Sequence, residues 1–268
     1  MSKRITVFLY GVLCYVAFLL VFLYAIGFLT GVGVPKTINS GATTSAAVAL
    51  VIDLLLLGLF AVQHTVMARP AFKRAWTRLV PPSVERSTFV LASSAVLALL
   101  FWQWRPLPAA VWNVGNPAGR DLLWILCGVG WTTVLLGSFM ISHTHLFGLS
   151  QVWNRMLSKP QPEPRFQTSW LYGYVRHPLM LGFIVAFWAI PRMTVGHLVF
   201  AAAATGYIVV GTQLFEEKDL VRYIGEPYRA YQHKVPAFFP RTGRHVRVEE
   251  LLPQAEKVGQ HAEAHGRG

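Results

Sequence analysis

Residues 172–192, YGYVRHPLMLGFIVAFWAIPR, decide the fold, because a polar, basic segment there runs directly into a short apolar one. The apolar part, from Leu179 to Ile190, has 12 residues, whereas a helix that crosses a bilayer takes about 20. Pro191 and Arg192 then make a tight turn, and a second apolar run leads from Met193 back to Phe215. The pattern predicts a helical hairpin with one short arm and one full-length arm.

The unequal arms predict a recess beside the longer helix. At about 1.5 Å per residue, the short arm climbs roughly 18 Å and the stretch from Met193 to Glu216 descends roughly 35 Å, which leaves a step of some 17 Å. Pro178 suits the first position of the short helix, whose free backbone N–H groups, with Arg176 and His177 beside them, can receive an anion. Such a recess fits a nucleotide-sized ligand, and a basic interfacial cap on the helix is the alternative.

Two adjacent acids, Glu216 and Glu217, stand where the longer arm is expected to end. Carboxylates near a helix C-terminus oppose the helix dipole by about 0.3 to 1 kcal/mol each, so each needs a partner. The partner is either a bound ligand or one of the cations Lys218, Arg222 and Arg176. The segment after Gly225 carries aromatic and basic residues that either fold back as a cover or form a solvated helix.

The remaining chain reads as a membrane protein. Of its 268 residues, 54% are hydrophobic and 13% are charged, against about 25% charged in an ordinary soluble domain. Charge-free runs of spanning length are Ile5–Pro35, Ser87–Trp104, Leu122–Asn154 and Met193–Phe215, and a fifth run, Ala46–Met67, contains Asp53. We therefore expect an all-α polytopic helix bundle with five full spans, one short helix in a hairpin and a cytoplasmic cofactor pocket.

The distribution of Lys and Arg sets the expected orientation. With the N-terminus inside, 20 of the 24 basic residues fall on the inner side, and Lys36, Arg105, Arg120 and Arg192 fall outside, as the positive-inside rule requires. This predicts a multi-pass protein of the cell (inner) membrane with both termini cytoplasmic. The charge is spread over every inner loop without a nucleic-acid-binding motif, so we expect membrane lipid and no nucleic acid as a partner.

The domain organisation is simple. Residues 1–240 are expected to form one integral-membrane domain, and residues 241–268 a polar, disordered cytoplasmic tail. In the first inner loop, Phe72, Trp76 and Leu79 share one helical face, which is typical of a helix lying on the membrane surface. Cys14 and Cys127 sit in apolar runs and are expected to be packing residues. The sequence carries no signal for the oligomeric state.

Histidines at membrane depth are the candidates for chemistry, because polar residues there are costly. His64 lies near the inner end of the second span, and His143 and His145 lie near the inner end of the fourth. The three are expected to share one inner vestibule. They could also bind haem, but no metal-like spacing accompanies them, and we expect no metal site.

An ordered set of residues resembles the cofactor half of the isoprenylcysteine carboxyl methyltransferase superfamily. The set is Arg176-His177-Pro178, Gly182, Glu216-Glu217, Gly225, Tyr228, Tyr231 and Val235-Pro236. Upstream pieces resemble one branch, the methanethiol S-methyltransferases. These pieces are Pro35–Ile38, Gln63–Pro70, Val84–Thr88, Phe101–Trp104 and Leu146–Leu149, so that the likeness spans roughly Ile5 to Pro240.

The resemblance implies a membrane enzyme that moves a methyl group from S-adenosyl-L-methionine to methanethiol, a small volatile thiol, giving dimethyl sulfide. It implies that the cofactor is bound by Tyr174, Arg176, His177, Pro178, Gly182, Glu216, Glu217 and Tyr228. Two positions depart from the pattern: Met180 replaces a common tyrosine, and His145 replaces an acid of the methanethiol branch. Hydrogen sulfide or another small thiol is therefore an alternative acceptor.

The chemistry of a thiol acceptor suggests roles for the histidines. A thiolate, not a thiol, attacks the methyl group, and a simple thiol is mostly protonated at neutral pH. We expect His143 or His145 to accept the proton as general base, with His64 in reserve. The rival functions are a phospholipid or isoprenoid methyltransferase with the same cofactor half, and a haem-binding membrane protein.

Overall fold

The computed structural model describes residues 2–161, 170–240 and 245–247. Within them, five helices are long and apolar enough to cross a membrane, and one apolar helix is shorter. The long helices are α1 (Ser2–Thr30), α2 (Ala46–Ala68), α4 (Pro82–Gln103), α5 (Pro117–Ile141) and a continuous helix of residues 195–224, and the short one is α8 (Pro178–Trp188). The predicted all-α membrane bundle is confirmed.

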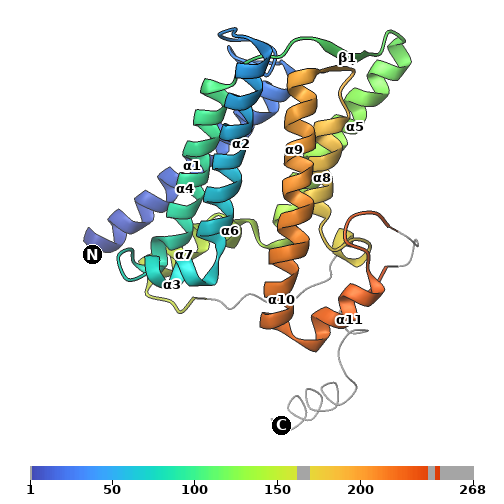
Figure 1. The fold of residues 1–268 in the computed structure, drawn as a ribbon. Coiled ribbons are helices and arrows are strands. Elements are labelled where there is room, and N and C mark those ends of the chain that lie inside the picture. The colour runs from blue at the N-terminus through green and yellow to red at the C-terminus, as the bar shows by residue number, and fades with distance from the viewer. Residues whose placement is uncertain (1, 162–169, 241–244, 248–268) are drawn as a thin grey trace.

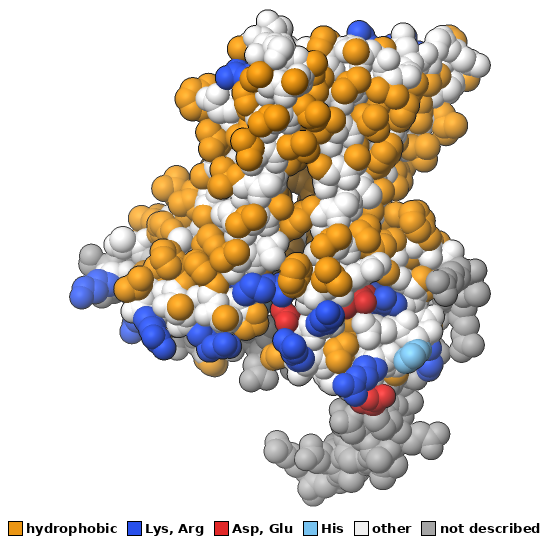
Figure 2. All heavy atoms as spheres, in the orientation of Figure 1, with side chains coloured by type: hydrophobic (Ala, Val, Ile, Leu, Met, Phe, Trp, Pro, Cys, Tyr) orange, Lys and Arg blue, Asp and Glu red, His pale blue; other side chains and the backbone are white. Residues whose placement is uncertain are grey.

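Short elements gather at the two ends of the bundle (Figure 1). One end, which we call the basic end, carries α3 (Pro70–Trp76), α6 (His143–Leu146), α7 (Leu149–Leu157), α10 (Glu217–Ile224) and α11 (Glu226–Lys234). Lys and Arg side chains gather there (Figure 2). At the other end, β1 (Ala110–Asn113) pairs antiparallel with β2 (Arg192–Thr194) and closes the turn after α8.

The predicted hairpin has the expected unequal arms. The long arm consists of α9 (Val195–Gly211), a π-helical turn (Thr212–Glu216) and α10, so the helix does not end at the acids as predicted but runs on to Ile224. The charge-free run Leu122–Asn154 also differs from expectation. It breaks at Ser142, which has a φ of 108°, and α6 and α7 follow the break.

The short helix packs on α5 with almost no side chain between the two backbones. A Cβ atom on Gly130 would lie 2.6 Å from the backbone nitrogen of Ala186, and one on Gly182 would lie 2.7 Å from the carbonyl oxygen of Gly130. At its far end, His197 is buried and bonds the carbonyl oxygen of Phe187 at 2.9 Å. These contacts fix where the short helix begins and ends relative to its longer neighbours.

The bundle consists of two helix groups that separate toward the basic end. One group pairs α1 and α2 with α4, and the other pairs α5 with α8. Large buried side chains join the groups, among them Phe28, Trp104, Trp131, Phe187 and Phe200. Figure 2 shows the surface hollowed between α2 and α9. The hydroxyls of Thr65 on α2 and Tyr207 on α9 lie 3.1 Å apart, so a polar contact joins the two helices.

The contact between α5 and α8 is open to a direct test. Gly130→Val should force the helices apart, because its side chain would meet backbone atoms that cannot move aside. Overpacking of this kind costs about 1 to 3 kcal/mol, which should lower the melting temperature in detergent. Gly128→Val is the matched control, because a Cβ atom at Gly128 of the same helix meets nothing within 4 Å. Equal melting temperatures for the two variants would contradict this packing.

Candidate active site

An ion-pair network joins the start of the short helix to the long arm. Nε and Nη2 of Arg176 each lie 2.7 Å from Oε1 of Glu217, and Nε2 of His177 lies 3.0 Å from the same oxygen. The Glu217 and Arg176 side chains are each 11% exposed and that of His177 is 5% exposed, so the charges are largely removed from water. Burial of this kind requires pairing. The sequence-predicted residues Arg176, His177 and Glu217 therefore meet.

The segment after Gly225 folds back over this network and covers it. Nη1 of Arg176 donates to the carbonyl oxygens of Gln232, at 2.9 Å, and of Val235. The backbone nitrogens of Arg176 and His177 donate to the carbonyls of Pro236 and Ala237. Of the two readings of this segment, the fold-back cover is the one observed.

The two acids have different surroundings. Both oxygens of Glu217 are engaged, because Oε2 accepts a 3.0 Å hydrogen bond from Gln232. The side chain of Glu216 is 45% exposed, and its nearest basic group among the ion pairs of the described structure is Nδ1 of His177 at 3.9 Å. Tyr172, whose pKa is raised by burial and next by the charge of Glu216, stays protonated nearby. Glu216 is thus the carboxylate with free capacity for a ligand.

The π-helical turn explains how both acids reach one imidazole. Neighbouring residues of an α-helix point about 100° apart, yet the two ring nitrogens of His177 face Glu216 and Glu217 separately. The wider turn at Thr212–Glu216 changes the local register. Single π-turns inside α-helices are frequent at functional sites.

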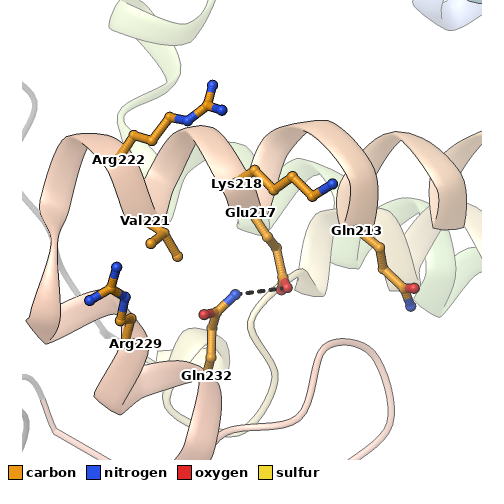
Figure 3. Close-up of a pocket in the computed structure, with 7 residues that line it drawn as sticks. All are labelled: Gln213, Glu217, Lys218, Val221, Arg222, Arg229 and Gln232. Atoms are coloured by element: carbon orange, nitrogen blue, oxygen red, sulfur yellow. Dashed lines mark hydrogen bonds between the residues drawn. The ribbon is translucent and has the colours of Figure 1, made fainter.

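A pocket of about 420 Å³ lies between α10 and α11, next to the network (Figure 3). The Glu217–Gln232 hydrogen bond forms part of its wall. Its remaining lining residues are Gln213, Lys218, Val221, Arg222 and Arg229. Three of these are cations, so the pocket offers positive charge beside the acids.

Other residues proposed for the cofactor have structural surroundings of their own. Pro178 is buried at the first turn of α8, where no side chain caps the free N–H groups. Gly182 faces α5, and the close backbone contact alone requires glycine there. Tyr228 is 3% exposed and packs on Tyr231. Tyr174 is 38% exposed, and its ring contacts that of His245 at 5.1 Å.

The expected disorder of residues 241–268 concerns residues that, apart from 245–247, lie outside the described ones. In those three, Val246 is buried and its backbone nitrogen donates to the carbonyl of Gly173 at 3.0 Å.

His143 has hydrogen-bond partners on both ring nitrogens. Nε2 lies 2.8 Å from the hydroxyl of Tyr15 on α1, and Nδ1 lies 2.9 Å from the hydroxyl of Ser138. The ring also stacks on Phe139, with centroids 4.4 Å apart, and meets Phe147 at 4.8 Å. His143 therefore ties α1 to the break after α5.

His64 and His145 are both influenced by the charge of Arg86 and do not take part in the hydrogen bonds of His143. Nδ1 of His64 lies 3.3 Å from the hydroxyl of Ser93, and no hydrogen bond to its Nε2 occurs in the described structure. The pKa of His145 is lowered by burial and then by the charges of Arg86 and Lys73. Arg86 also acts electrostatically on His64. The structure thus groups His64 and His145 around Arg86, while His143 faces α1.

Sequence reasoning passed over Arg86 and Gln232. In the sequence, Arg86 directly precedes the charge-free run that starts at Ser87, and it resembles the other cations of the inner loop. In the structure, α4 begins at Pro82 and therefore includes Arg86. Gln232 carried no signal, because a polar residue on a short amphipathic helix is ordinary. In the described part of the chain, no group of three or more His, Cys, Asp or Glu residues is arranged to hold a metal.

The fold and the network define a multi-pass membrane protein with a covered acid–arginine site. Comparison with known proteins specifies the family. The chain is 54% identical over 244 residues to the methanethiol S-methyltransferase of Mycobacterium tuberculosis, an alignment that covers 91% of this chain and 100% of the relative. It is 49% identical over 240 residues to the methanethiol S-methyltransferase of a Pseudomonas species, covering 90% and 92%. The chain belongs to the methanethiol S-methyltransferase family.

More distant similarity extends to nurim proteins. A nurim homologue of Drosophila pseudoobscura is 28% identical over 205 residues, which covers 74% of this chain and 80% of the relative. No protein-family profile and no solved structure matches the chain.

The Glu217 network should stabilise the cover formed by α11. Glu217→Ala would leave Arg176 and His177 without their buried counter-ion, and breaking one side of a buried pair costs about 3 kcal/mol or more. We expect a lower melting temperature in detergent and faster proteolysis within 226–234. Glu226→Ala is the control, because its pair with Arg229 is exposed and worth at most about 1 kcal/mol. Equal effects would show that the network does not hold the cover.

Proposed function

We propose that the chain catalyses transfer of a methyl group from S-adenosyl-L-methionine to methanethiol, with dimethyl sulfide as product. The observation that carries the proposal is the 54% identity along the whole length of the Mycobacterium tuberculosis methanethiol S-methyltransferase. The covered site at the start of the short helix is consistent with it. Hydrogen sulfide or another small thiol is the alternative acceptor, because His145 and Met180 depart from the family pattern.

The residues present fit the proposed methyl donor, which carries a sulfonium, an ammonium and a carboxylate. Glu216 offers a carboxylate with free capacity for a cationic group. The uncapped N-terminus of α8 offers N–H groups to a carboxylate. Arg176, His177 and Glu217 then act by holding these two features together and by keeping water out under the cover. When bound, the donor supplies an electrophilic methyl group.

The proposed base is His145. Its lowered pKa keeps the imidazole neutral at pH 7, which is the form that accepts a proton from a thiol. His143 is proposed as a positioning residue, because both of its nitrogens are engaged. His64 keeps its reserve role, since its Nε2 has no partner in the described structure.

We further propose that residues 1–240 carry the whole enzyme and that the basic end faces the cytoplasm in the cell membrane. The excess of Lys and Arg at that end supports this orientation. A soluble donor would then reach Glu216 from the cytosol. Methanethiol, a small apolar molecule, would arrive through the lipid.

One assay tests donor and acceptor together. Membranes that contain the protein are incubated with methyl-labelled S-adenosyl-L-methionine and, separately, methanethiol, hydrogen sulfide or lipid acceptors. We expect labelled dimethyl sulfide in the headspace above the methanethiol sample. Label in lipid alone, or in no product, would overturn the proposal. A Soret band in the purified protein would instead support a haem protein.

Substitutions should separate cofactor binding from acceptor chemistry. Glu216→Gln should weaken binding of S-adenosylhomocysteine about tenfold or more in isothermal titration, because a charge-assisted contact is worth about 1.5 to 3 kcal/mol. Glu226→Gln, which removes an exposed carboxylate of α11, is the matched control. Unchanged affinity in Glu216→Gln would exclude Glu216 from the cofactor site.

His145→Gln should lower kcat about 100-fold, the low end for loss of a general base, with affinity for S-adenosylhomocysteine retained. Because the neutral imidazole is the active form and its pKa is lowered, it should give the wild-type kcat/KM profile an acid limb that falls below pH 6.5 as the base becomes protonated. His145→Gln should lack this acid limb. An unchanged pH profile in the variant would show that His145 is not the base.

A further inference from the structure

Arg86 is a partly buried cation that forms no ion pair with a carboxylate of the described residues. It lies in the second turn of α4 and is only partly exposed. Nε donates to the carbonyl of Leu146 at 2.6 Å, and the guanidinium carbon lies 5.0 Å from the centroid of the Phe89 ring. Among the ion pairs of the described residues, none includes Arg86. Buried charges are ordinarily paired, so a missing anion is indicated.

The residues that hold Arg86 come from two elements, α4 and α6, and leave part of its fork free. Leu146 of α6 and Phe89 of α4 fix the guanidinium, and its Nη atoms make no hydrogen bond in the described structure. The ring of His64 on α2 lies 4.9 Å from that of Phe89, so Phe89 contacts both Arg86 and His64. A rigid donor fork beside an apolar ring is a suitable site for a small anion with an apolar substituent.

The charged and titratable groups around Arg86 sum to a positive field. Lys73 of α3 is the second cation, and Glu85 of α4 is the acid that acts on both. Among the described residues, no ion pair joins Glu85 to Arg86 or to Lys73. The imidazoles are His64 of α2 and His145 of α6. Arg69 and Asp219, which pair with each other at 3.1 Å, also act on Lys73. Burial lowers the pKa of Lys73, yet three cations face two acids, so the field favours an anion.

We propose that Arg86, supported by Lys73, binds the acceptor of the methyl transfer as its thiolate, with the apolar substituent against Phe89. This rests on the proposed function and adds an acceptor site on α3 and α4, which are separate from the elements that carry Pro178, Glu216 and Glu217. The role differs from general base catalysis, because Arg86 takes no proton and stabilises the ionised sulfur. The ligand class is a small, soft, monovalent anion.

The step balances without any further reactant. The S–H bond of the thiol breaks, and its proton goes to a ring nitrogen of His145 and from there to water. The sulfur lone pair forms a bond to the methyl carbon of the sulfonium donor. The bond between that carbon and the donor sulfur breaks, and its electron pair stays on the donor sulfur. Dimethyl sulfide and S-adenosylhomocysteine result.

Two measurements on purified full-length protein in detergent test the site. Thiocyanate, a soft monovalent anion, should bind in isothermal titration and inhibit competitively with methanethiol. Arg86→Gln should abolish this binding. It should also lower kcat/KM for methanethiol at pH 7 about 100-fold and move its alkaline rise upward by about two pH units, because a nearby opposite charge lowers a pKa by about 1 to 3. Arg86→Lys, which keeps the charge, should restore part of both effects.

Controls separate the possible outcomes. Arg78→Gln removes an exposed cation of the same region and should leave both readouts unchanged. Affinity for S-adenosylhomocysteine should persist in Arg86→Gln, and its loss would show that Arg86 serves the fold or the cofactor. If Arg86→Gln does not fold, the thiocyanate affinities of the wild type and of Arg86→Lys test the site instead. Failure of the wild type to bind thiocyanate would then overturn the proposal.

The proposal and the proposed function fail in different ways. If thiols are methylated but the pH profile of Arg86→Gln equals that of the wild type, the thiolate site is wrong and the function stands. If no thiol is methylated while thiocyanate binds in an Arg86-dependent way, the function is wrong and the anion site stands.

Discussion

The ion pair between Arg176 and Glu217 is the contact on which the site depends. It connects the first turn of α8 to the long arm of the hairpin, and through Gln232 and Val235 it also holds the returning segment. A charge so little exposed would be costly alone, so each partner needs the other in place. The start of α8, the long arm of the hairpin and the covering segment after Gly225 therefore stabilise one another, and the site forms only when all three meet.

The short helix is the second constraint. Because α8 packs on α5 through glycines, its backbone position is fixed within narrow limits, and its free N-terminus lies at the depth of the two acids. At the π-helical turn the two acids differ in their surroundings. Glu217 pairs with Arg176 and His177, whereas Glu216 remains exposed. A regular α-helix would point the two carboxylates in more divergent directions.

The basic end has two charged regions, which we propose to bind ligands of opposite charge. The region around Glu216 suits a cationic donor, and the region around Arg86 suits an anion. The surface is hollowed between α2 and α9 (Figure 2). A reaction that joins a cation to an anion gains from such separation, because each reactant is attracted to its own side before they meet.

The sequence by itself determined the bundle and the short arm of the hairpin, because hydropathy, helix length and turn residues are local properties. It marked Arg176 and Glu217 as candidate residues but left the partner of the acid open. Only the tertiary structure decided which charges are satisfied. It showed that His143 is bonded on both nitrogens, that the long arm continues past Glu216, and that Arg86 forms no ion pair with an acid of the described residues. Hydrogen bonds between residues more than a hundred positions apart, such as Tyr15 to His143, depend on how helices pack, and no local pattern specifies that.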